Sequence, residues 1–434
     1  MNKMSIQLFF IIFAIIFNQI PAYCQTMYSL SELAQLANKH SETIKIAEDD
    51  LNIAQLEKAR ALSVLIPRAT AFGNMTEYKN DNITSPDTLA LGVKLTQSFT
   101  LNGKELIALD VTKKSIEGKE FSLESIRSQY LLQVSQAYYN ILSAQRYFEI
   151  AQSDVNRLTT HRDAVKEKLS VGNVTKTDLY RAEAELSKSL TEKVKAENGI
   201  LQTKAVLRNL VEIEEDYNLK KANIEDIEKY HLSLEDIQTQ ALKNRTEIKE
   251  AKKNLEIARK TVRYEKSDFW PTISLEAGYK ETDITYYDYR PRDVEYDTED
   301  LYFKGELVFT LYDGGLRRAQ IRQALANQRK AENALILQEK SIILDAKISF
   351  LDYQTAKSTL LNLQDELKSA QENFNAVQMQ FKYGMADSID MMDANTLLVT
   401  AQRRISDAEY TYYLSVLKIL YTKGDLSKFF LDQA

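Results

Sequence analysis

The segment that decides the fold occurs twice in the chain. Residues 29–67 read SLSELAQLANKHSETIKIAEDDLNIAQLEKARALSVLIP, and residues 233–271 read SLEDIQTQALKNRTEIKEAKKNLEIARKTVRYEKSDFWP. The two segments align without a gap at an offset of 204 residues. The matching pairs are Leu30/Leu234, Ala37/Ala241, Ile44/Ile248, Ala47/Ala251, Leu51/Leu255, Ile53/Ile257, Ala54/Ala258 and Pro67/Pro271. A gapless internal repeat of this length predicts a duplicated architecture.

The correspondence resumes later in each half at an offset of 212 residues. The pairs are Gly172/Gly384, Asp178/Asp390 and Ala182/Ala394. The additional eight residues of the second half therefore lie between Pro271 and the helix that follows. We divide the mature chain into a first repeat (25–231, helical tip near 172) and a second repeat (232–434, helical tip near 384). Each repeat is expected to contain a helix, two strands, a very long helix, a tight turn and a helix.

Alternating apolar residues predict two strands between the helices of each repeat. We place strands at about 68–78 and 88–101, and at about 272–282 and 301–311, and we interpret Thr282 to Asp300 as a surface loop. Strands of about ten residues have the length of a tilted barrel strand. A small soluble sheet with one wet face is the alternative. Because open sheet edges are not tolerated in lipid, membrane insertion would require several copies to pool their strands.

Heptad spacing predicts two very long helices. Apolar positions recur in steps of four and three from Ile126 to Leu169, and again from Ile342 to Phe381. No proline occurs from 87 to 270 or from 292 to the end, so both stretches can be helical throughout. A helix from 104 to 171 would be about 100 Å long. A plain structural coiled coil is the alternative interpretation of a heptad pattern.

The amino terminus has the pattern of a secretory signal peptide. Lys3 precedes an apolar run from Ile6 to Phe17, which is too short to span a bilayer. We assign residues 1–24 to the signal and expect the mature chain outside the cytoplasm. Cys24 is the only cysteine, so no disulfide can form within one chain. Its lipidation is an alternative, although Tyr23 is a poor fit to the small residue expected before a lipidated cysteine.

Nothing in the sequence predicts an enzyme, a cofactor site or a nucleic-acid-binding protein. The formal net charge is -6, and no dense basic cluster occurs. The only histidines are His40, His161 and His231, and we expect each of them on a solvated surface. No phosphate-binding loop and no spacing typical of metal ligands is present.

The signal peptide, the two-fold repeat, the paired strands and the long helices together resemble the TolC-like outer membrane efflux protein family over the whole mature chain. The family's glycine-containing turn from strand to helix resembles Phe99–Lys104, with Gly103, and Phe309–Gly315, with Gly314 and Gly315. Its helical tip motif has a glycine, an aspartate six residues later and an alanine ten residues later. This motif matches Gly172, Asp178 and Ala182, and Gly384, Asp390 and Ala394.

The resemblance implies a mainly α protein with a β-barrel contribution. Three copies would form a 12-stranded outer-membrane β-barrel, continued into the periplasm by an α-helical barrel. The expected function is a passive exit duct of a tripartite efflux pump or a type I secretion system. Its partners would be outer-membrane lipid, a periplasmic adaptor and an inner-membrane transporter of the RND or ABC type. A periplasmic coiled-coil adaptor or structural protein without a pore is the alternative.

The resemblance also implies site residues at the periplasmic end. The family's aperture rings correspond to Asp390 and Asp393, with Thr177 and Asp178 on the neighbouring helix pair and Phe381 at a position that is often tyrosine. Such carboxylates would favour cations and could trap a divalent metal. The glycine turns at Gly172 and Gly384 would receive the adaptor.

A local reading competes with the aperture for two of these aspartates. Thr175 and Asp387 are good N-cap residues, so Asp178 and Asp390 could instead stabilise helix starts. The family's basic residue two positions after the tip glycine is Ala386 here, and Phe381 has no hydroxyl for a gating hydrogen bond. We therefore do not expect this chain to reproduce those two gate contacts.

Overall fold

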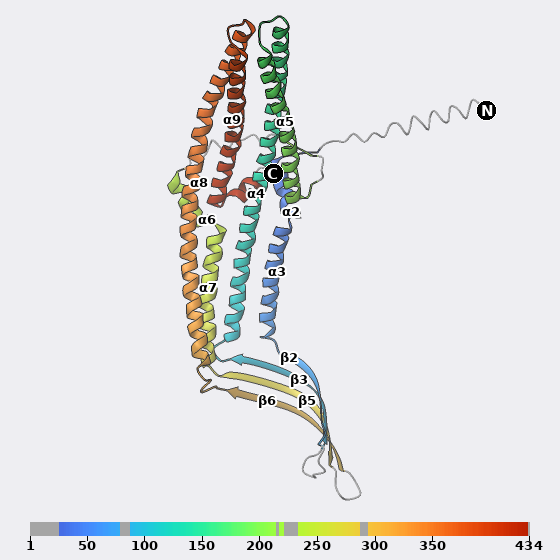
Figure 1. Cartoon of the computed structure of the whole chain (residues 1–434). Coiled ribbons are helices and arrows are strands. Elements are labelled where there is room, and N and C mark those ends of the chain that lie inside the picture. The colour runs from blue at the N-terminus through green and yellow to red at the C-terminus, as the bar shows by residue number, and fades with distance from the viewer. Residues whose placement is uncertain (1–25, 79–86, 214–216, 221–232, 287–293, 433–434) are drawn as a thin grey trace, which may run out of the picture.

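The chain folds into an elongated molecule with a sheet at one end and two helical hairpin tips at the other (Figure 1). The computed structural model describes residues 26–78, 87–213, 217–220, 233–286 and 294–432. The expected signal peptide, Cys24 and His231 lie outside these residues. In the described part of the chain, no helix combines the length and the apolar character that crossing a membrane requires.

The helices and strands alternate in two similar series. The elements of the first are β1 (Thr26–Tyr28), α2 (Leu30–His40), α3 (Glu42–Ser63), β2 (Arg68–Thr76), β3 (Asp87–Thr100), α4 (Lys104–Ser170), α5 (Lys176–Val211) and β4 (Tyr217–Leu219). The elements of the second are α6 (Leu234–Asn244), α7 (Thr246–Lys266), the 3-10 turn η1 (Ser267–Phe269), β5 (Thr272–Tyr286), β6 (Val294–Val308), α8 (Leu316–Lys382), α9 (Ser388–Lys423) and α10 (Leu426–Asp432).

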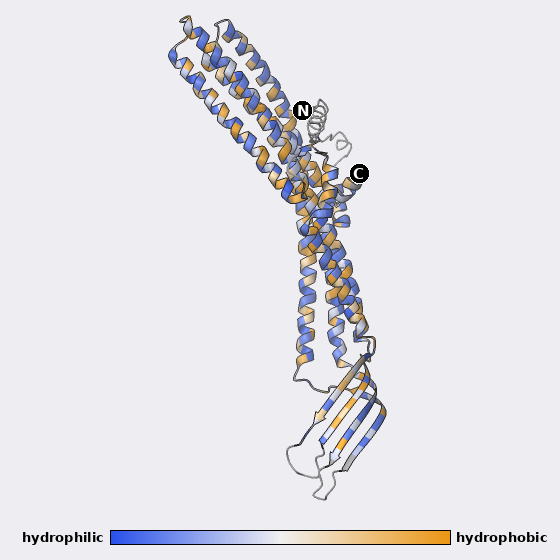
Figure 2. Ribbon diagram, turned by 90° about the vertical axis from the view of Figure 1, so that its right-hand side faces the viewer, coloured by the Kyte–Doolittle hydropathy of each residue, from blue (hydrophilic) through white to orange (hydrophobic). Residues whose placement is uncertain are grey.

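Four strands form an antiparallel sheet in the order β2-β3-β5-β6. Its alternating hydropathy is visible along the strands in Figure 2. The side chains of Leu91, Val93 and Leu95 on β3, and of Leu301 and Phe303 on β6, are largely exposed. The sheet thus offers apolar side chains to its surroundings, and β2 and β6 are its two edges.

The expected loop from Thr282 to Asp300 is too long. Strand β5 continues to Tyr286 and β6 begins at Val294, so the expected strands 272–282 and 301–311 are displaced at one or both ends. The added ends pair directly, with Glu281 opposite Glu299 and Asp283 opposite Asp297. The side chains here are acidic and interrupt the apolar alternation from which strands are predicted, so the sequence pattern did not show the full length of these strands. Residues 287–293 lie outside the described part.

The two longest helices, α4 and α8, each have 67 residues, and each starts at a glycine with left-handed backbone. The N-cap residues are Gly103, with φ of 72°, and Gly315, with φ of 94°. Only glycine adopts this conformation without a steric cost. Towards the tips the helices lie side by side in the order α5, α4, α9, α8, and towards the sheet in the order α3, α4, α7, α8. The protomer is therefore a curved wall one helix thick.

The main hydrophobic core lies midway along the long helices. Tyr138, Ile141 and Leu142 of α4 pack there with Leu33 of α2 and Leu417 of α9. Strands β1 and β4 form a short parallel pair beside this core, and α10 packs against α4 and α9. The long helices therefore connect both ends of the molecule to one central hydrophobic core.

Candidate gate at the helical tips

Each helical hairpin closes through a glycine with positive φ. Gly172 follows α4 with φ of 79°, and Gly384 follows α8 with φ of 78°. In the turn that follows α4, the amides of Gly172 and Asn173 donate to the carbonyls of Leu169 and Lys168. No atom lies within 4 Å of a Cβ built on either glycine. The glycines are therefore required by the backbone conformation and not by crowding.

The helices that leave the tips begin with matching capping boxes. The Thr175 hydroxyl accepts from the amide of Asp178, and the Asp178 carboxylate accepts from the Thr175 amide at 2.8 Å. Asp387 and Asp390 exchange the same pair of hydrogen bonds at the start of α9. Hydrogen bonds from the side chain and then the backbone of Thr175 hold the pKa of Asp178 below its usual value. The structure therefore shows that both aspartates cap the starts of helices, which is the local alternative to an aperture role.

Two further predicted aperture residues lie on the surface of the tips. The side chains of Asp393 and Thr177 are exposed. Asp393 lies beyond the first turn of α9 and takes no part in the capping box. Its carboxylate is therefore free to face the axis of an assembly, and its aperture role stays a prediction.

Phe381 is buried between the two hairpins, with 6% of its surface exposed. Its ring lies 3.9 Å from Nζ of Lys168 on α4, and the same ammonium donates to the carbonyl oxygen of Phe381. The expectation that Phe381 lines the aperture is therefore wrong for this protomer. An aromatic ring in an apolar cluster with Val165 and Met391 gains more from burial than from facing water.

His161 was expected on a solvated surface, and this expectation is wrong. Only 5% of the residue is exposed, and Nε2 lies 2.9 Å from the Ser388 hydroxyl, which belongs to the first residue of α9. Its ring centroid lies 5.0 Å from that of Phe381. His40, by contrast, is partly exposed and lies 3.7 Å from a carboxylate oxygen of Glu212.

Polar contacts continue along the interface between α4 and α9. Asn395 accepts from Nε of Arg157 at 2.8 Å and donates to Asp154 at 2.7 Å. Further from the tip, the Tyr147 hydroxyl donates to the carboxylate of Asp407. The sequence gives no local signal for these pairs because their members lie more than 230 residues apart. Together with His161 and Lys168, they join the two hairpins of one protomer.

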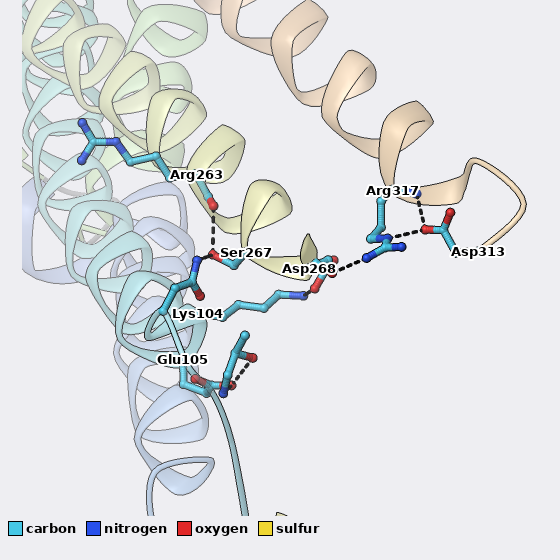
Figure 3. A network of polar contacts seen from close by, with 9 residues as sticks. Lys104, Glu105, Arg263, Ser267, Asp268, Asp313 and Arg317 are labelled. Atoms are coloured by element: carbon cyan, nitrogen blue, oxygen red, sulfur yellow. Dashed lines mark hydrogen bonds and ion pairs between the residues drawn. The ribbon is translucent and has the colours of Figure 1, made fainter. Parts of the chain in front are cut away.

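At the other end of the long helices, a second polar network fixes the turns from strand to helix (Figure 3). Arg317 is buried and donates to Asp313, to the Asp268 carbonyl at 3.0 Å and to the Thr310 carbonyl at 2.8 Å. Lys104, the first residue of α4, pairs with the Asp268 carboxylate. The predicted turn glycines Gly103, Gly314 and Gly315 all have positive φ. The starts of α4 and α8 are thus both tied to η1.

Among the described residues, no group of three or more His, Cys, Asp or Glu side chains is placed to hold a metal ion. In the network between the hairpins, Nη2 of Arg157 and Nδ1 of His161 are buried without a hydrogen-bond partner. The hydroxyl of Ser388 lies next to the His161 imidazole, and both residues are buried between the hairpins.

Comparison with known proteins decides the family. The family model described as "Outer membrane efflux protein" matches residues 33–211 and 238–420. The chain belongs to the outer membrane efflux protein family. The two matched segments contain both hairpin tips and all four long strands, so the match covers both features described above.

The relatives of this efflux protein include an outer membrane protein and a secretion protein. The chain is 24% identical over 423 residues to outer membrane protein TolC of Escherichia coli (strain K12), covering 95% of this chain and 83% of TolC. It is 22% identical to the alkaline protease secretion protein AprF of Pseudomonas aeruginosa, covering 73% of this chain and 66% of AprF. The prediction of an outer-membrane efflux or secretion channel is confirmed.

Solved structures share the fold. The outer membrane channel CmeC of Campylobacter jejuni superposes with a TM-score of 0.80 at 16% identity, covering 92% of this chain and 86% of that one. The predicted fold class, mainly helical with strands that contribute to a barrel, is confirmed. Family members and structural neighbours are channel proteins and not enzymes.

Proposed function

We propose that this efflux protein is a homotrimeric, passive exit duct that catalyses nothing. In this proposal it works with a periplasmic adaptor and an inner-membrane transporter of the RND or ABC type. The observation that carries the proposal is a sheet of four strands with two unpaired edges, β2 and β6, and exposed apolar side chains. Such a sheet cannot remain open in lipid. It closes when the β6 edge of one copy pairs with the β2 edge of the next.

The registers within the protomer support this pairing. Arg68 of β2 lies opposite Thr96 of β3, and shifting the two residues by 204 and 212 positions gives Thr272 opposite Val308, the pair observed in β5 and β6. The two strand pairs therefore have equivalent registers. The central pair of Lys94 with Gly278 then maps onto Glu306 in β6 and Asn74 in β2 of the next copy.

The helices support the same junction. Within the protomer, Lys253 of α7 lies 2.8 Å from Glu117 of α4. The corresponding positions are Asp49 on α3 and Arg329 on α8, both exposed. The two charges have exchanged places, so α3 of one copy remains complementary to α8 of the next. Opposite charges at an interface fix register and orientation more than they add affinity.

The ionic pair at the base of the helices has an apolar counterpart. Lys104 and Asp268 correspond to Leu316 and Val64, whose residues are 59% and 55% exposed. Two exposed aliphatic side chains at the corresponding junction would be covered when the next copy docks. This exchange favours a second copy of the same chain over an unrelated partner, because the same backbone geometry is used twice.

At the far end, the hairpin tips would form the periplasmic aperture. We propose that Asp393 contributes a carboxylate ring there, with Asp390, Asp178 and Thr177 close to it, and that the rings favour cations and can trap a divalent ion. The glycine turns at Gly172 and Gly384 present exposed backbone at the end of the molecule, where an adaptor would dock. A poreless periplasmic coiled-coil protein is the competing function.

A disulfide between copies tests the proposed closure. In a Cys24→Ser background, Asn74→Cys combined with Glu306→Cys should give a covalently linked trimer on oxidation. As a control, Thr70→Cys combined with Glu306→Cys displaces one thiol by four residues, roughly 13 Å along the strand, and should give no link. Equal linking of both pairs, or linking of neither in folded protein, would contradict the proposed register.

A further inference from the structure

The most distinctive titratable group in the described part of the chain is His161, which lies in the tip at the junction of two hairpins. It belongs to α4, its Nε2 contacts the Ser388 hydroxyl of α9, and its ring faces the Phe381 ring of α8. Three helices thus meet at one imidazole. The tip motifs do not include this histidine.

The surroundings of His161 suit a neutral ring. Nδ1 is buried and has no hydrogen-bond partner. A protonated imidazole donates from both nitrogens, so it would place an unsatisfied N–H and a positive charge in this interface. Leaving a buried charged donor unpaired costs more than leaving a neutral acceptor unpaired.

The charged groups around the ring add to this cost. From α4, Lys168 already places its ammonium over the Phe381 ring, which is also the neighbour of His161. From α9, Ser388 lies at the helix start, where the macrodipole disfavours a cation. Burial, together with the charge of Lys168, lowers the pKa of His161.

The nearby carboxylates are already engaged in helix capping. On α9, Asp387 accepts from the amides of Ile389 and Asp390, and Asp390 accepts from the Asp387 amide. On α5, which packs against α4 towards the tip, Asp178 is bound to Thr175. From α8, the groups that face this site are the Phe381 ring and its carbonyl, which Lys168 holds.

We propose that His161 is a proton-sensitive latch, which joins the α8/α9 hairpin to α4 as a neutral imidazole and releases it when protonated. In the released form the ring reaches water and takes up a proton at its ordinary pKa of about 6.5. Because the released form binds more protons, acidification favours it. The latch needs only the fold of one protomer, and its effect on conduction rests on the proposed duct.

The difference in proton binding between the joined and the released form sets how strongly pH changes the equilibrium constant for release. If the joined form takes up no proton, lowering the pH from about 7.5 to about 5.5 should raise the equilibrium constant for release by about tenfold per protomer. Any protonation of the joined form reduces this factor. The response should be centred near pH 6, in the range where no carboxylate with an ordinary pKa titrates.

Spin labels at the two tip turns can measure the release. The protein would be produced from the full-length sequence with Cys24→Ser, Asn173→Cys and Lys382→Cys, both label sites being exposed, and would be mixed with excess unlabelled protein. Distances between the labels should show a separated population that grows up to about tenfold between pH 7.5 and pH 5.5. His161→Gln keeps an amide donor for Ser388 but cannot titrate, so its distances should not depend on pH.

Two further variants complete the test. His40→Gln alters the partly exposed histidine of α2 and should leave the pH response intact. Lys168→Gln removes the neighbouring cation and so raises the pKa of His161 in the joined form. The separated population should then grow less between pH 7.5 and pH 5.5 than in the unaltered chain, which gives a second readout if His161→Gln does not fold. The proposal is overturned if the unaltered chain shows the same distances at both pH values, or if a folded His161→Gln responds as the unaltered chain does.

Discussion

The Asn395 carboxamide of α9 lies 2.8 Å from Nε of Arg157 on α4 and at the same time donates to Asp154. One neutral side chain on the second hairpin thus bridges a cation and an anion on the first. Arg157 and Asp154 are themselves only 3.6 Å apart, so Asn395 completes a pair that exists without it. The interface between the hairpins therefore combines this polar bridge with the apolar cluster around Phe381.

Removing this bridge should loosen the tips. Asn395→Ala should cost about 2 kcal/mol, because hydrogen bonds to charged groups are lost in a largely buried site. This corresponds to a shift of roughly thirtyfold towards separated hairpins, measured by the same distances between spin labels. Thr400→Ala, at an exposed position of the same helix, should have no such effect. Identical distances in both variants would mean that Asn395 does not hold the hairpins together.

Replacing the exposed aspartate of α9 should change ion selectivity. If Asp393 lines the aperture, Asp393→Asn should lower the preference for cations over anions by roughly twofold or more, measured from reversal potentials in a salt gradient. Asp178→Asn should change selectivity less, because that carboxylate is bound in a capping box. Unchanged selectivity in the Asp393 variant would place this residue away from the conduction path.

The junction between sheet and helices should depend on Arg317. Its guanidinium satisfies Asp313 and two backbone carbonyls and packs on the Phe269 ring at 4.6 Å. Arg317→Ala leaves these buried acceptors without donors and should cost about 3 kcal/mol, seen as a lower melting temperature. Arg318→Ala, at the exposed neighbouring position, is the control. Equal melting temperatures would mean that the network in Figure 3 contributes little to stability.

Stability should also depend on pH through Glu247. Burial alone would raise the pKa of Glu247, but the hydrogen bonds and charge of Arg245 outweigh it, and the pKa lies below its usual value. A depressed folded pKa means that the carboxylate stabilises the fold above its unfolded pKa, and that this contribution is lost as the pH falls through the folded pKa.

Replacing Glu247 should lower the stability of the fold by an amount that depends on pH. Glu247→Gln leaves the buried Arg245 unpaired and should cost about 3 kcal/mol at pH 7, with the cost shrinking below about pH 4. Thermal unfolding of the purified protein at both pH values measures it. Glu57→Gln, exposed on α3, should cost little at either pH. A cost that does not vary with pH would show that the pair acts through packing and not through charge.

The sequence predicted those features whose physical cause is local. The heptad pattern and the absence of proline predicted a helix from 104 to 171, and α4 spans Lys104–Ser170. The capping alternative rested on residues three positions apart, and both capping boxes are present. Positive φ at the tip and turn glycines follows from the same local chemistry.

The sequence did not predict features that depend on a residue far along the chain or on a change from buried to exposed surroundings. His161 is buried because Ser388 and Phe381, more than 200 residues away, close over it, and no window of the sequence contains that information. Strands β5 and β6 extend beyond the apolar alternation because backbone pairing continues after burial ends. The bridge through Asn395 was missed for the same reason as His161.

The central claim is that copies of this chain enclose a conducting pore. The most direct test is single-channel recording from the purified, folded protein reconstituted in planar bilayers. Discrete conductance steps are expected, and they should be lost when the protein is denatured before reconstitution. Folded protein that inserts but never conducts would contradict the duct and favour a poreless periplasmic protein.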